Sequence, residues 1–426
     1  MKLSDKNIVL FIGNIPDRYI ETIKDIEVNI KMNFKIVIFL DDKEKLLLSP
    51  EYREKVHNII RCDSNNKKEI SKKLNLIKKD VLMIFYIYES DADFYCEVLK
   101  NIKLENNPST ESIKKSTDKM KMRKAFYRYD PSMIPKFMLI KSKDDLELIS
   151  KKIGFPCILK PAHLSKSRLV TVSQNEDELK KNLDKTFSVI NKVYKKWKIK
   201  PNPLILAEEM MVGKMYSVDV FIDNRQKIYF TPVVDLITAR DVGIDDFHHY
   251  ARILPSNLNA NDIKKAYIIA KKGIEALGLK SSVAHIELIK TKKGWKIVEI
   301  GSRMGGYRNK MLKLSYDIEY FKNYFLIRLN KKPTFKNKLI AYSTVLEFFP
   351  KEEGCLKSVK GIYKIKKLNS FSEMEINSNI GNFVGFAKNG YLNVLYVLLG
   401  NKNRKTFYKD LKTVESLIKI ETSKSK

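Results

Sequence analysis

Short apolar runs alternate with longer polar stretches along the first part of the chain. The runs at 7–13, 35–42, 58–62 and 81–89 are continuous rather than alternating. Runs of this kind, separated by helix-length segments, indicate strands buried on both faces of an open parallel sheet. We therefore predict an α/β domain over residues 1–112. The turn after the first strand reads GNIPD, which lacks the GxGxxG spacing of a dinucleotide-binding turn.

The pattern changes in the middle of the chain. A polar segment with a proline, LENNPSTESIKKSTDK, is interpreted as the exit from the first domain. A helix then begins near Thr117 or Asp118, either of which can cap it, and ends before YDPSMIPKF. From Lys151 to Arg308 strand-like segments dominate, interrupted by helical stretches at 176–198 and 261–277. This mixture favours α+β layers over a barrel. Beyond about residue 339 further alternating segments lead to a closing helix at 405–418.

Composition narrows the class of protein. A chain of 426 residues with 44% hydrophobic content is typical of a packed protein of about two to four units. The formal charge of +31 would suit nucleic acid, but the lysines are scattered rather than gathered in one stripe. We expect no nucleic-acid partner, and an anionic small molecule fits the charge equally well. An RNA-binding protein with salt-dependent binding stays open as an alternative.

The cysteines and the apolar runs bear on location. The four cysteines lie far apart without a CxxC pair, so neither a zinc site nor a disulfide framework is indicated. No apolar run approaches the roughly 20 residues that a membrane span requires, and the N-terminus runs straight into a strand-like segment. We expect a cytoplasmic protein that does not associate with a membrane.

The sequence AHIELIKTKKGWKIVEIG, residues 284–301, predicts a β-hairpin. A three-residue turn over 292–294, with glycine in the left-handed position, would place Glu287 opposite Glu299 and His285 opposite Gly301. The residues between them, Ile286, Leu288, Val298 and Ile300, would then share the apolar face. A two-residue turn would instead put the glutamates out of opposition.

Two opposed carboxylates repel each other unless something positive lies between them. Mg²⁺ is the most economical partner, because oxygen ligands at this separation suit one ion or a pair that clamps transferring phosphates. Alternatively, both glutamates face solvent and a lysine neutralises each. The following GSRMGG favours the metal, because Arg303 offers a forked donor to phosphate, and Gly305 and Gly306 let the backbone approach a substrate.

Together these segments resemble the ATP-grasp superfamily, and within it the carboxylate-amine ligases of the L-amino-acid (dipeptide) ligase type. The resemblance covers most of the chain. It rests on TDKMKMRKAF, GFPCILKPAHLSKSRLVTV, LILAEEMMVGKMYSVDVFID, the hairpin with its EIGSRMGG, and the lid-like EEGCLKSVKGIYKI. It implies an α/β and α+β protein with an ATP-grasp fold: an N-terminal pre-ATP-grasp domain (1–112), a small lobe with a linker helix (113–212), and a large lobe (213–426) that ends in a lid-like subdomain from about 339.

The resemblance also implies the site residues. Lys119 and Lys160 would reach the phosphates of ATP, and Lys160 and Arg303 would have catalytic roles. The metal ligands would be Glu287 and Glu299, and the metal Mg²⁺ or Mn²⁺. The adenine and ribose would contact a hinge segment made of Glu208, Glu209, Met210 and Met211. The loop HLSKSRL lacks the glycines usual in this superfamily. Either Ser165 and Ser167, with Lys166 and Arg168, would supply the phosphate donors instead, or the loop would be flexible.

The implied activity is amide-bond formation from a small-molecule carboxylate and an amine, with amino acids as the expected substrates. Candidate substrate-binding residues are His248, His249, Arg252, His285, Gly305 and Gly306. Ligases of this type are often homodimers, which is the oligomeric state we expect here. Two further alternatives stay open: a carboxylase-like or purine-pathway enzyme of the same superfamily that uses carboxyphosphate, and, as a different class of protein, a nucleotide-binding sensor of ATP that does not ligate.

Overall fold

The N-terminal part is an open parallel sheet with helices on both sides, as the apolar runs predicted. The computed structural model describes residues 6–164, 168–196, 199 and 202–423. Its first four strands lie parallel in the order β3-β2-β1-β4. Their bounds are β1 Ile8–Ile12, β2 Lys35–Asp41, β3 Asn58–Cys62 and β4 Val81–Tyr86. The helices of this part are α1 Asp17–Ile30, α2 Pro50–Arg53, α3 Lys67–Leu74 and α4 Ala92–Leu99.

The segment that follows contains a helix that the sequence analysis did not predict. Helix α5 spans Thr110–Thr117. Its N-cap is Ser109, whose hydroxyl accepts a hydrogen bond from the backbone N–H of Ser112. Its Ile113 is fully buried in the core of the N-terminal sheet, and this tertiary contact offsets a polar sequence. Helix α6, Lys119–Tyr129, follows at once, and its cap is Asp118 rather than Thr117.

The small lobe is built on an antiparallel sheet with the strand order β5-β8-β6-β7. The strands are β5 Phe137–Ile140, β6 Cys157–Pro161, β7 Thr171–Ser173 and β8 Ile205–Glu209, and the helices are α7 Leu146–Lys152 and α8 Glu176–Lys196. Apolar residues of α8, such as Leu179 and Leu183, share one buried cluster with Leu159 and Ala207 of the sheet. The helix predicted at 176–198 begins at the expected residue.

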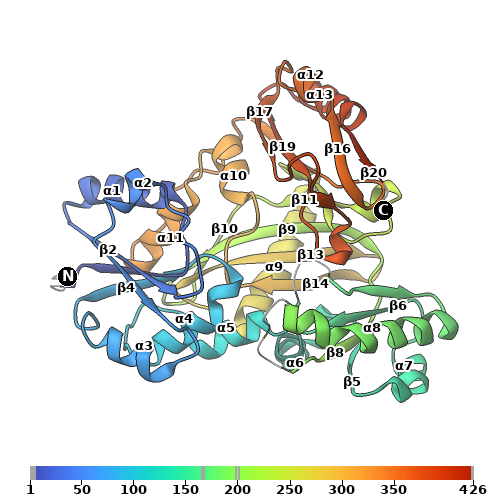
Figure 1. The fold of residues 1–426 in the computed structure, drawn as a ribbon, viewed down its shortest axis with the longest axis horizontal. Helices are drawn as coiled ribbons and strands as arrows, with labels where there is room; N and C mark the ends of the chain where they lie inside the picture. The colour runs from blue at the N-terminus through green and yellow to red at the C-terminus, as the bar shows by residue number, and fades with distance from the viewer. Residues whose placement is uncertain (1–5, 165–167, 197–198, 200–201, 424–426) are drawn as a thin grey trace.

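A nine-stranded sheet runs through the middle of the molecule (Figure 1), and in it the strands of the large lobe continue into those of the C-terminal part. Its strands are β9 Gly213–Ile222, β10 Ile228–Phe230, β11 Val234–Thr238, β12 His249–Leu254, β13 Ser282–Thr291, β14 Gly294–Gly301, β15 Tyr342–Phe348, β17 Phe371–Ile376 and β19 Leu395–Asn401. Helix α9, Ala260–Leu277, packs on one face of β9, β13 and β14 and corresponds to the helix predicted at 261–277.

The remaining helices tie the parts together. Helices α10, Arg308–Tyr316, and α11, Tyr320–Arg328, share a buried cluster with the N-terminal sheet and with the large sheet. In α11, Phe321 and Phe325 pack on Phe85 of β4, with ring centroids 5.5 and 5.8 Å away. The N-terminal part is therefore joined to the large lobe by a continuous apolar core.

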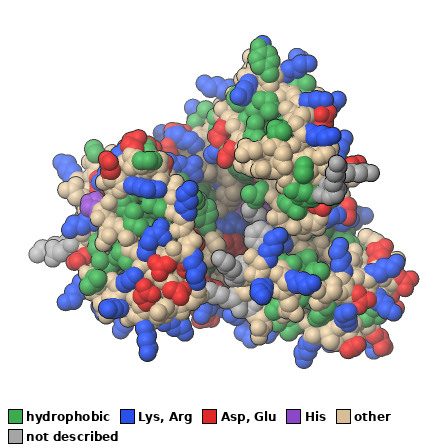
Figure 2. Space-filling model, viewed as in Figure 1, with side chains coloured by type: hydrophobic (Ala, Val, Ile, Leu, Met, Phe, Trp, Pro, Cys, Tyr) green, Lys and Arg blue, Asp and Glu red, His purple; other side chains and the backbone are tan. Residues whose placement is uncertain are grey.

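The C-terminal part also contains a separate three-stranded sheet, formed by β16 Gly354–Lys360, β18 Phe383–Val384 and β20 Lys419–Ser423. The helices of the C-terminal part are α12, Ile362–Ile365, and α13, Arg404–Leu417. Figure 2 shows a hollow where this part, the N-terminal part and the small lobe face one another. No helix in the described part of the chain is long and apolar enough to span a membrane. The domain boundaries near 112, 212 and 339 stay predictions.

Candidate active site

The β13–β14 hairpin places the two predicted carboxylates directly opposite each other. Glu287 is paired with Glu299, and His285 with Gly301, as expected. The turn, however, is shorter than predicted: Thr291 pairs with Gly294, so only Lys292 and Lys293 lie between the strands. A bulge after Glu287 restores the opposition, because β14 contributes one extra residue there.

The bulge also changes which residues reach the core. Ile286, Leu288 and Ile300 belong to the buried cluster under α9, as predicted, but their fourth partner is Ile297 and not Val298. The prediction for Val298 is therefore wrong, because the extra residue shifts the alternation by one position. Val298 is half-buried, and its carbonyl accepts a hydrogen bond of 2.8 Å from Nη2 of Arg123.

Lys119 reaches the carboxylate pair from the first turn of α6. Its Nζ lies 3.3 Å from Oε1 of Glu299 and donates to the carbonyl of Leu164 at 2.8 Å. The helix start is fixed by Asp118, whose Oδ1 accepts from the N–H groups of Met120 and Lys121 at 2.9 and 3.0 Å. The cap therefore sets the position from which Lys119 extends toward the hairpin.

Lys160, on β6, belongs to a buried ionic network beside this cluster. Its Nζ lies 2.7 Å from Oε2 of Glu208, and Arg123 donates to the same carboxylate from Nε at 2.8 Å and Nη2 at 3.2 Å. Burial, together with the neighbouring Arg123, lowers the pKa of Lys160 to about 8. Burial alone would raise the pKa of Glu208, but the two cations hold it at about 2. The pair therefore stays ionised near neutral pH.

Arg123 was missed in the sequence, although a signal for it exists. It lies four residues after Lys119, so both side chains share one face of α6. It is only 1% exposed, and a buried arginine requires a carboxylate partner. The predicted hinge residue Glu208 supplies that partner, so its carboxylate is already bound to two cations.

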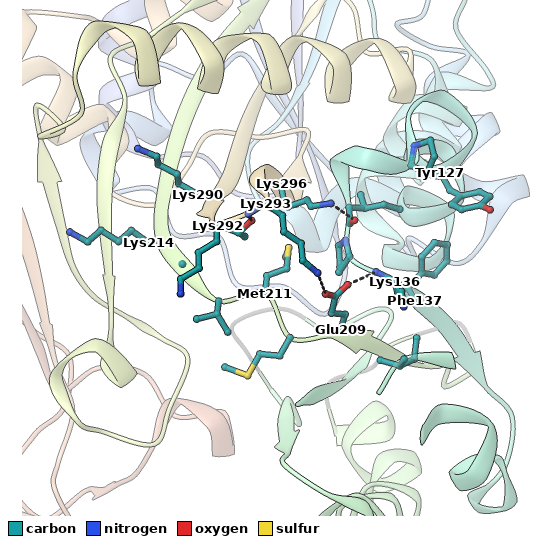
Figure 3. A pocket seen from close by; sticks show the side chains of 18 of the residues that line it. Tyr127, Lys136, Phe137, Glu209, Met211, Lys214, Lys290, Lys292, Lys293 and Lys296 are labelled. Carbon is teal, nitrogen blue, oxygen red and sulfur yellow. Dashed lines mark hydrogen bonds and ion pairs between the residues drawn. The ribbon is translucent and has the colours of Figure 1, made fainter. Parts of the chain in front are cut away.

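The other hinge residue, Glu209, points elsewhere. Its carboxylate accepts from the backbone N–H of Lys136 at 3.4 Å and lies 3.8 Å from Nζ of Lys293 (Figure 3). Successive side chains of a strand face opposite ways, so Glu208 and Glu209 cannot both face Lys160. Met210 and Met211 follow Glu209 in the chain, and all three residues line one groove. Ser165 and Ser167 lie outside the described residues.

His285 connects the carboxylate pair to a buried hub at Asp219. Strand β9 places Asp219 beside His285, and Nδ1 of His285 lies 2.7 Å from Oδ1 of Asp219. Nε2 of His285 lies 3.5 Å from Oε1 of Glu287, and Nε2 of His249 lies 3.8 Å from the same oxygen. Burial opposes the charged imidazole, but Asp219 outweighs it and raises the pKa of His285. Burial lowers the pKa of His249 to about 4.

Gly305 is required by the same hub. Its backbone N–H donates to Oδ2 of Asp219 at 2.9 Å, and a Cβ at this position would lie 2.3 Å from Nδ1 of His285. A Cβ at Gly306 would meet nothing within 4 Å, so that position is open. The glycine pair therefore has two different roles, a close approach to the imidazole and free space beside it.

Arg303 meets the N-terminal part of the chain. Its Nε donates to Oε2 of Glu89 at 3.0 Å, and Glu89 lies three residues after the end of β4. Burial would lower the pKa of Arg303, but Glu89 and the carboxylate pair raise it. Glu89 was not predicted, because nothing in the local sequence indicates that the end of β4 faces the hairpin.

The predicted substrate-binding residues Arg252, His248 and His249 do not all face the carboxylate pair. Arg252 lies on β12, and its Nη1 is 2.8 Å from Oε2 of Glu347, an unpredicted residue. Oε1 of Glu347 accepts from the hydroxyl of Tyr307 at 2.9 Å and from Nδ2 of Asn393 at 2.7 Å. His248 turns the other way, to Asp246 at 3.3 Å and to the ring of Phe349. The structure thus brings His249 to Glu287 but leaves His248 apart.

The donor set fits a hard divalent cation bound together with phosphate. Within the described residues no group of three or more His, Cys, Asp or Glu side chains is placed to hold a metal by itself. The chain offers two opposed carboxylates, Glu287 and Glu299, with Lys119 beside them. Mg²⁺ commonly takes one or two protein carboxylates and completes its shell with phosphate oxygens and water. Glu287 and Glu299 could hold it in that way.

Comparison with known proteins bears on the fold. Residues 153–310 match the ATP-grasp domain family. This segment is an ATP-grasp domain. The whole fold resembles the crystal structure of an L-amino acid ligase from Bacillus licheniformis, with a TM-score of 0.80 and 13% identity over 99% of this chain and 100% of that one. It also resembles the ADP complex of N5-carboxyaminoimidazole synthetase from Staphylococcus aureus, with a TM-score of 0.70 and 14% identity over 97% and 98% of the two chains.

Curated relatives are more distant in sequence. Alanine–anticapsin ligase of Bacillus subtilis is 26% identical over 209 residues, which cover 46% of this chain and 43% of that protein. L-arginine-specific L-amino acid ligase of Bacillus subtilis is 22% identical over 303 residues, or 70% of each chain. The chain spans about half the length of the curated relatives that it matches first. These similarities confirm the ATP-grasp fold and the resemblance to amino-acid ligases that the sequence suggested.

Proposed function

We propose that this ATP-grasp protein is an ATP-dependent carboxylate-amine ligase that forms an amide bond and releases ADP and phosphate. The observation that carries the proposal is the opposition of Glu287 and Glu299 on the open face of β13–β14, with Lys119 in contact with Glu299. Two carboxylates beside a lysine suit the polyphosphate of a nucleotide bound with a divalent cation. The fold-level likeness to an L-amino acid ligase supports the same assignment.

The chain's own residues would act mainly through position and charge. Lys119 and Lys160 would neutralise phosphate oxygens, and Ser165 and Ser167 stay predicted donors to them. Lys160 enters the reaction pre-oriented, because Glu208 holds its ammonium group. Mg²⁺ or Mn²⁺, held by Glu287 and Glu299, would supply further neutralisation of the phosphate charge. Met210 and Met211 stay the predicted hinge contacts for adenine, together with Glu208 and Glu209.

The proposed reaction has two steps. A substrate carboxylate oxygen attacks the γ-phosphorus of ATP, the bond to the β-phosphate oxygen breaks, and an acyl phosphate and ADP result. An amine nitrogen then attacks the acyl carbon, phosphate leaves, and the nitrogen loses a proton. Arg303 would hold the acyl phosphate by its forked donors, with Glu89 keeping the guanidinium in place.

The substrates are proposed to be amino acids, and the protein a cytoplasmic homodimer. Arg252 is the proposed partner of a substrate carboxylate, which would share the guanidinium with Glu347. His249, His285, Gly305 and Gly306 lie nearer to Glu287 and would border the reacting groups. His248 has no such position, since it faces Asp246.

The first test is phosphate release from Mg-ATP by the purified protein, with pools of amino acids present or absent. We expect release that depends on a pool containing the correct acid and amine, together with a product whose mass is the sum of both minus water. The Lys160→Ala variant should release no phosphate in any pool. Release independent of every pool, or unaffected by Lys160→Ala, would contradict the proposal.

The same assay separates the alternatives. An enzyme using carboxyphosphate would release phosphate in response to bicarbonate rather than to paired amino acids. The fold likeness to N5-carboxyaminoimidazole synthetase supports this second candidate, at the lower TM-score of 0.70 against 0.80. A sensor would bind ATP and release no phosphate under any of these conditions.

The affinity for ATP should fall as the pH rises through the pKa of Lys160. This pKa is lowered to about 8 by burial beside Arg123, so the ammonium group is charged below that pH and neutral above it. A neutral amine does not attract phosphate, so we expect the dissociation constant of ATP to rise roughly tenfold between about pH 7 and pH 9.5. Calorimetric titration at both pH values measures this change. The Lys160→Arg variant should show a flat profile, and an equally steep profile in that variant would assign the titration to another group.

A further inference from the structure

A groove with a volume of about 1060 Å³ lies where the segment after β8 joins the two lobes (Figure 3). One wall is the start of β5 with the chain before it, including Ile134 and Phe137. The segment from Glu209 to Gly213 forms the second wall, and the turn of the β13–β14 hairpin forms the third. Lys119, Lys160 and Glu208 do not line this groove. The predicted hinge residues Glu209, Met210 and Met211 do line it, so the groove adjoins the candidate active site, and Glu209 faces it from the side of β8 opposite to Glu208.

The lining is strongly cationic. Lys136 and Lys152 come from the small lobe. The other lysines come from the large lobe and are Lys214, Lys290, Lys292, Lys293 and Lys296. Against these seven lysines the lining contains one carboxylate, that of Glu209. The whole chain has 81 Lys and Arg against 50 Asp and Glu, so composition alone does not account for this excess.

Internal partners neutralise only part of this charge. Lys290 pairs with Asp262 at 2.7 Å, and Lys293 lies 3.8 Å from Glu209. Among the described residues, no carboxylate lies within 4 Å of Nζ of Lys136, Lys214 or Lys292. Like charges gathered in a concave surface raise the local concentration of anions. An anion with several charges would relieve their mutual repulsion.

The second wall of the groove is largely apolar. Val212 is 68% exposed, and Met210 and Met211 precede it on the segment that joins the lobes. On the facing wall Tyr127, which is 60% exposed, meets the ring of Phe137 edge-on at 6.2 Å. An aromatic or apolar body would cover these side chains while its charged groups met the lysines.

We propose that this groove is a binding site for a small polyanion with an aromatic or apolar body. The volume is that of a pocket for a ligand of roughly nucleotide size. The occupant would contact both lobes, because Lys136 and Lys152 belong to one and Lys214 and Lys292 to the other. This inference does not depend on the ligase activity.

The test uses pyranine, a fluorescent pyrene trisulfonate, as the probe and the whole protein without ATP. We expect a saturable rise in fluorescence anisotropy that corresponds to one site per chain and weakens with salt. Reversing two charges in the double variant Lys214→Glu/Lys292→Glu should raise the dissociation constant about tenfold or more. Both lysines are exposed, so the core is not disturbed.

Two controls give the result its meaning. The double variant Lys68→Glu/Lys72→Glu changes the net charge equally at exposed positions on α3, and it should bind pyranine as the unaltered protein does. The Lys160→Ala variant should also bind it normally. Equal weakening in the α3 variant would show an unspecific charge effect, and loss of binding in Lys160→Ala would place pyranine in the active site. Either result would overturn the proposal.

Discussion

Replacing Glu299 by glutamine should reduce turnover by roughly a thousandfold, the upper range for loss of one preorganised electrostatic group. Glutamine keeps the size of the side chain but removes the charge that faces Glu287 and pairs with Lys119 at 3.3 Å. A neutral amide is a poorer ligand for a hard cation than a carboxylate. Phosphate release from Mg-ATP with the active amino-acid pool measures the loss.

The fold of this variant should survive, because the side chain of Glu299 is 28% exposed and lies outside the core. Thermal unfolding should therefore change little. Glu421→Gln is the matched control: this glutamate pairs with Lys360 on the edge of the three-stranded sheet, away from the hairpin, and its loss should leave turnover intact. Full activity in Glu299→Gln would refute the site assignment.

The hairpin shows how far periodicity alone can reach. The opposition of Glu287 and Glu299 was predicted correctly, but from a turn that is one residue too long. The bulge supplies the missing residue, and its signal in the sequence is weak because Ile297 and Val298 are equally apolar. Only the buried surface under α9 decides which of the two enters the core. Tertiary packing therefore set the register that local turn chemistry could not.

The residues that the sequence did not reveal share one property. Arg123, Glu89 and Asp219 all act on partners that are distant along the chain. Arg123 reaches Glu208, Glu89 reaches Arg303, and Asp219 reaches His285. Motifs report short spacings, whereas these contacts depend on which strands and lobes become neighbours. The predicted lysines and glutamates could be proposed from the sequence because each belongs to a compact motif with a fixed place on a strand or helix.

Helix α5 was missed for a related reason. Its sequence is polar and follows a proline, which locally favours a loop. It is held by a serine cap and by burial of Ile113 against the N-terminal sheet. The alternation of Glu208 and Glu209, by contrast, could have been predicted, because adjacent strand residues must face opposite sides.

Replacing Asp219 by asparagine should destabilise the folded protein by about 3 to 5 kcal/mol, the usual result of removing one partner from a buried ion pair. Asp219 is 1% exposed and accepts from Gly305 N–H at 2.9 Å and from the hydroxyl of Tyr320 at 3.0 Å, beside His285 at 2.7 Å. Nε of Arg308, itself 1% exposed, lies 3.6 Å away. Urea unfolding followed by circular dichroism measures the loss.

The size of this effect follows from geometry as well as charge. The carboxylate of Asp219 has donors on both oxygens, so the amide group of asparagine must present its own N–H to at least one of them. A buried donor facing a donor adds its desolvation cost to that of the unpaired Arg308. Asp317→Asn is the control, because this side chain is 65% exposed and pairs with Lys313, so its loss should cost less than about 1 kcal/mol. If Asp219→Asn were no more destabilising than Asp317→Asn, the buried hub would not be what holds the glycine pair beside His285.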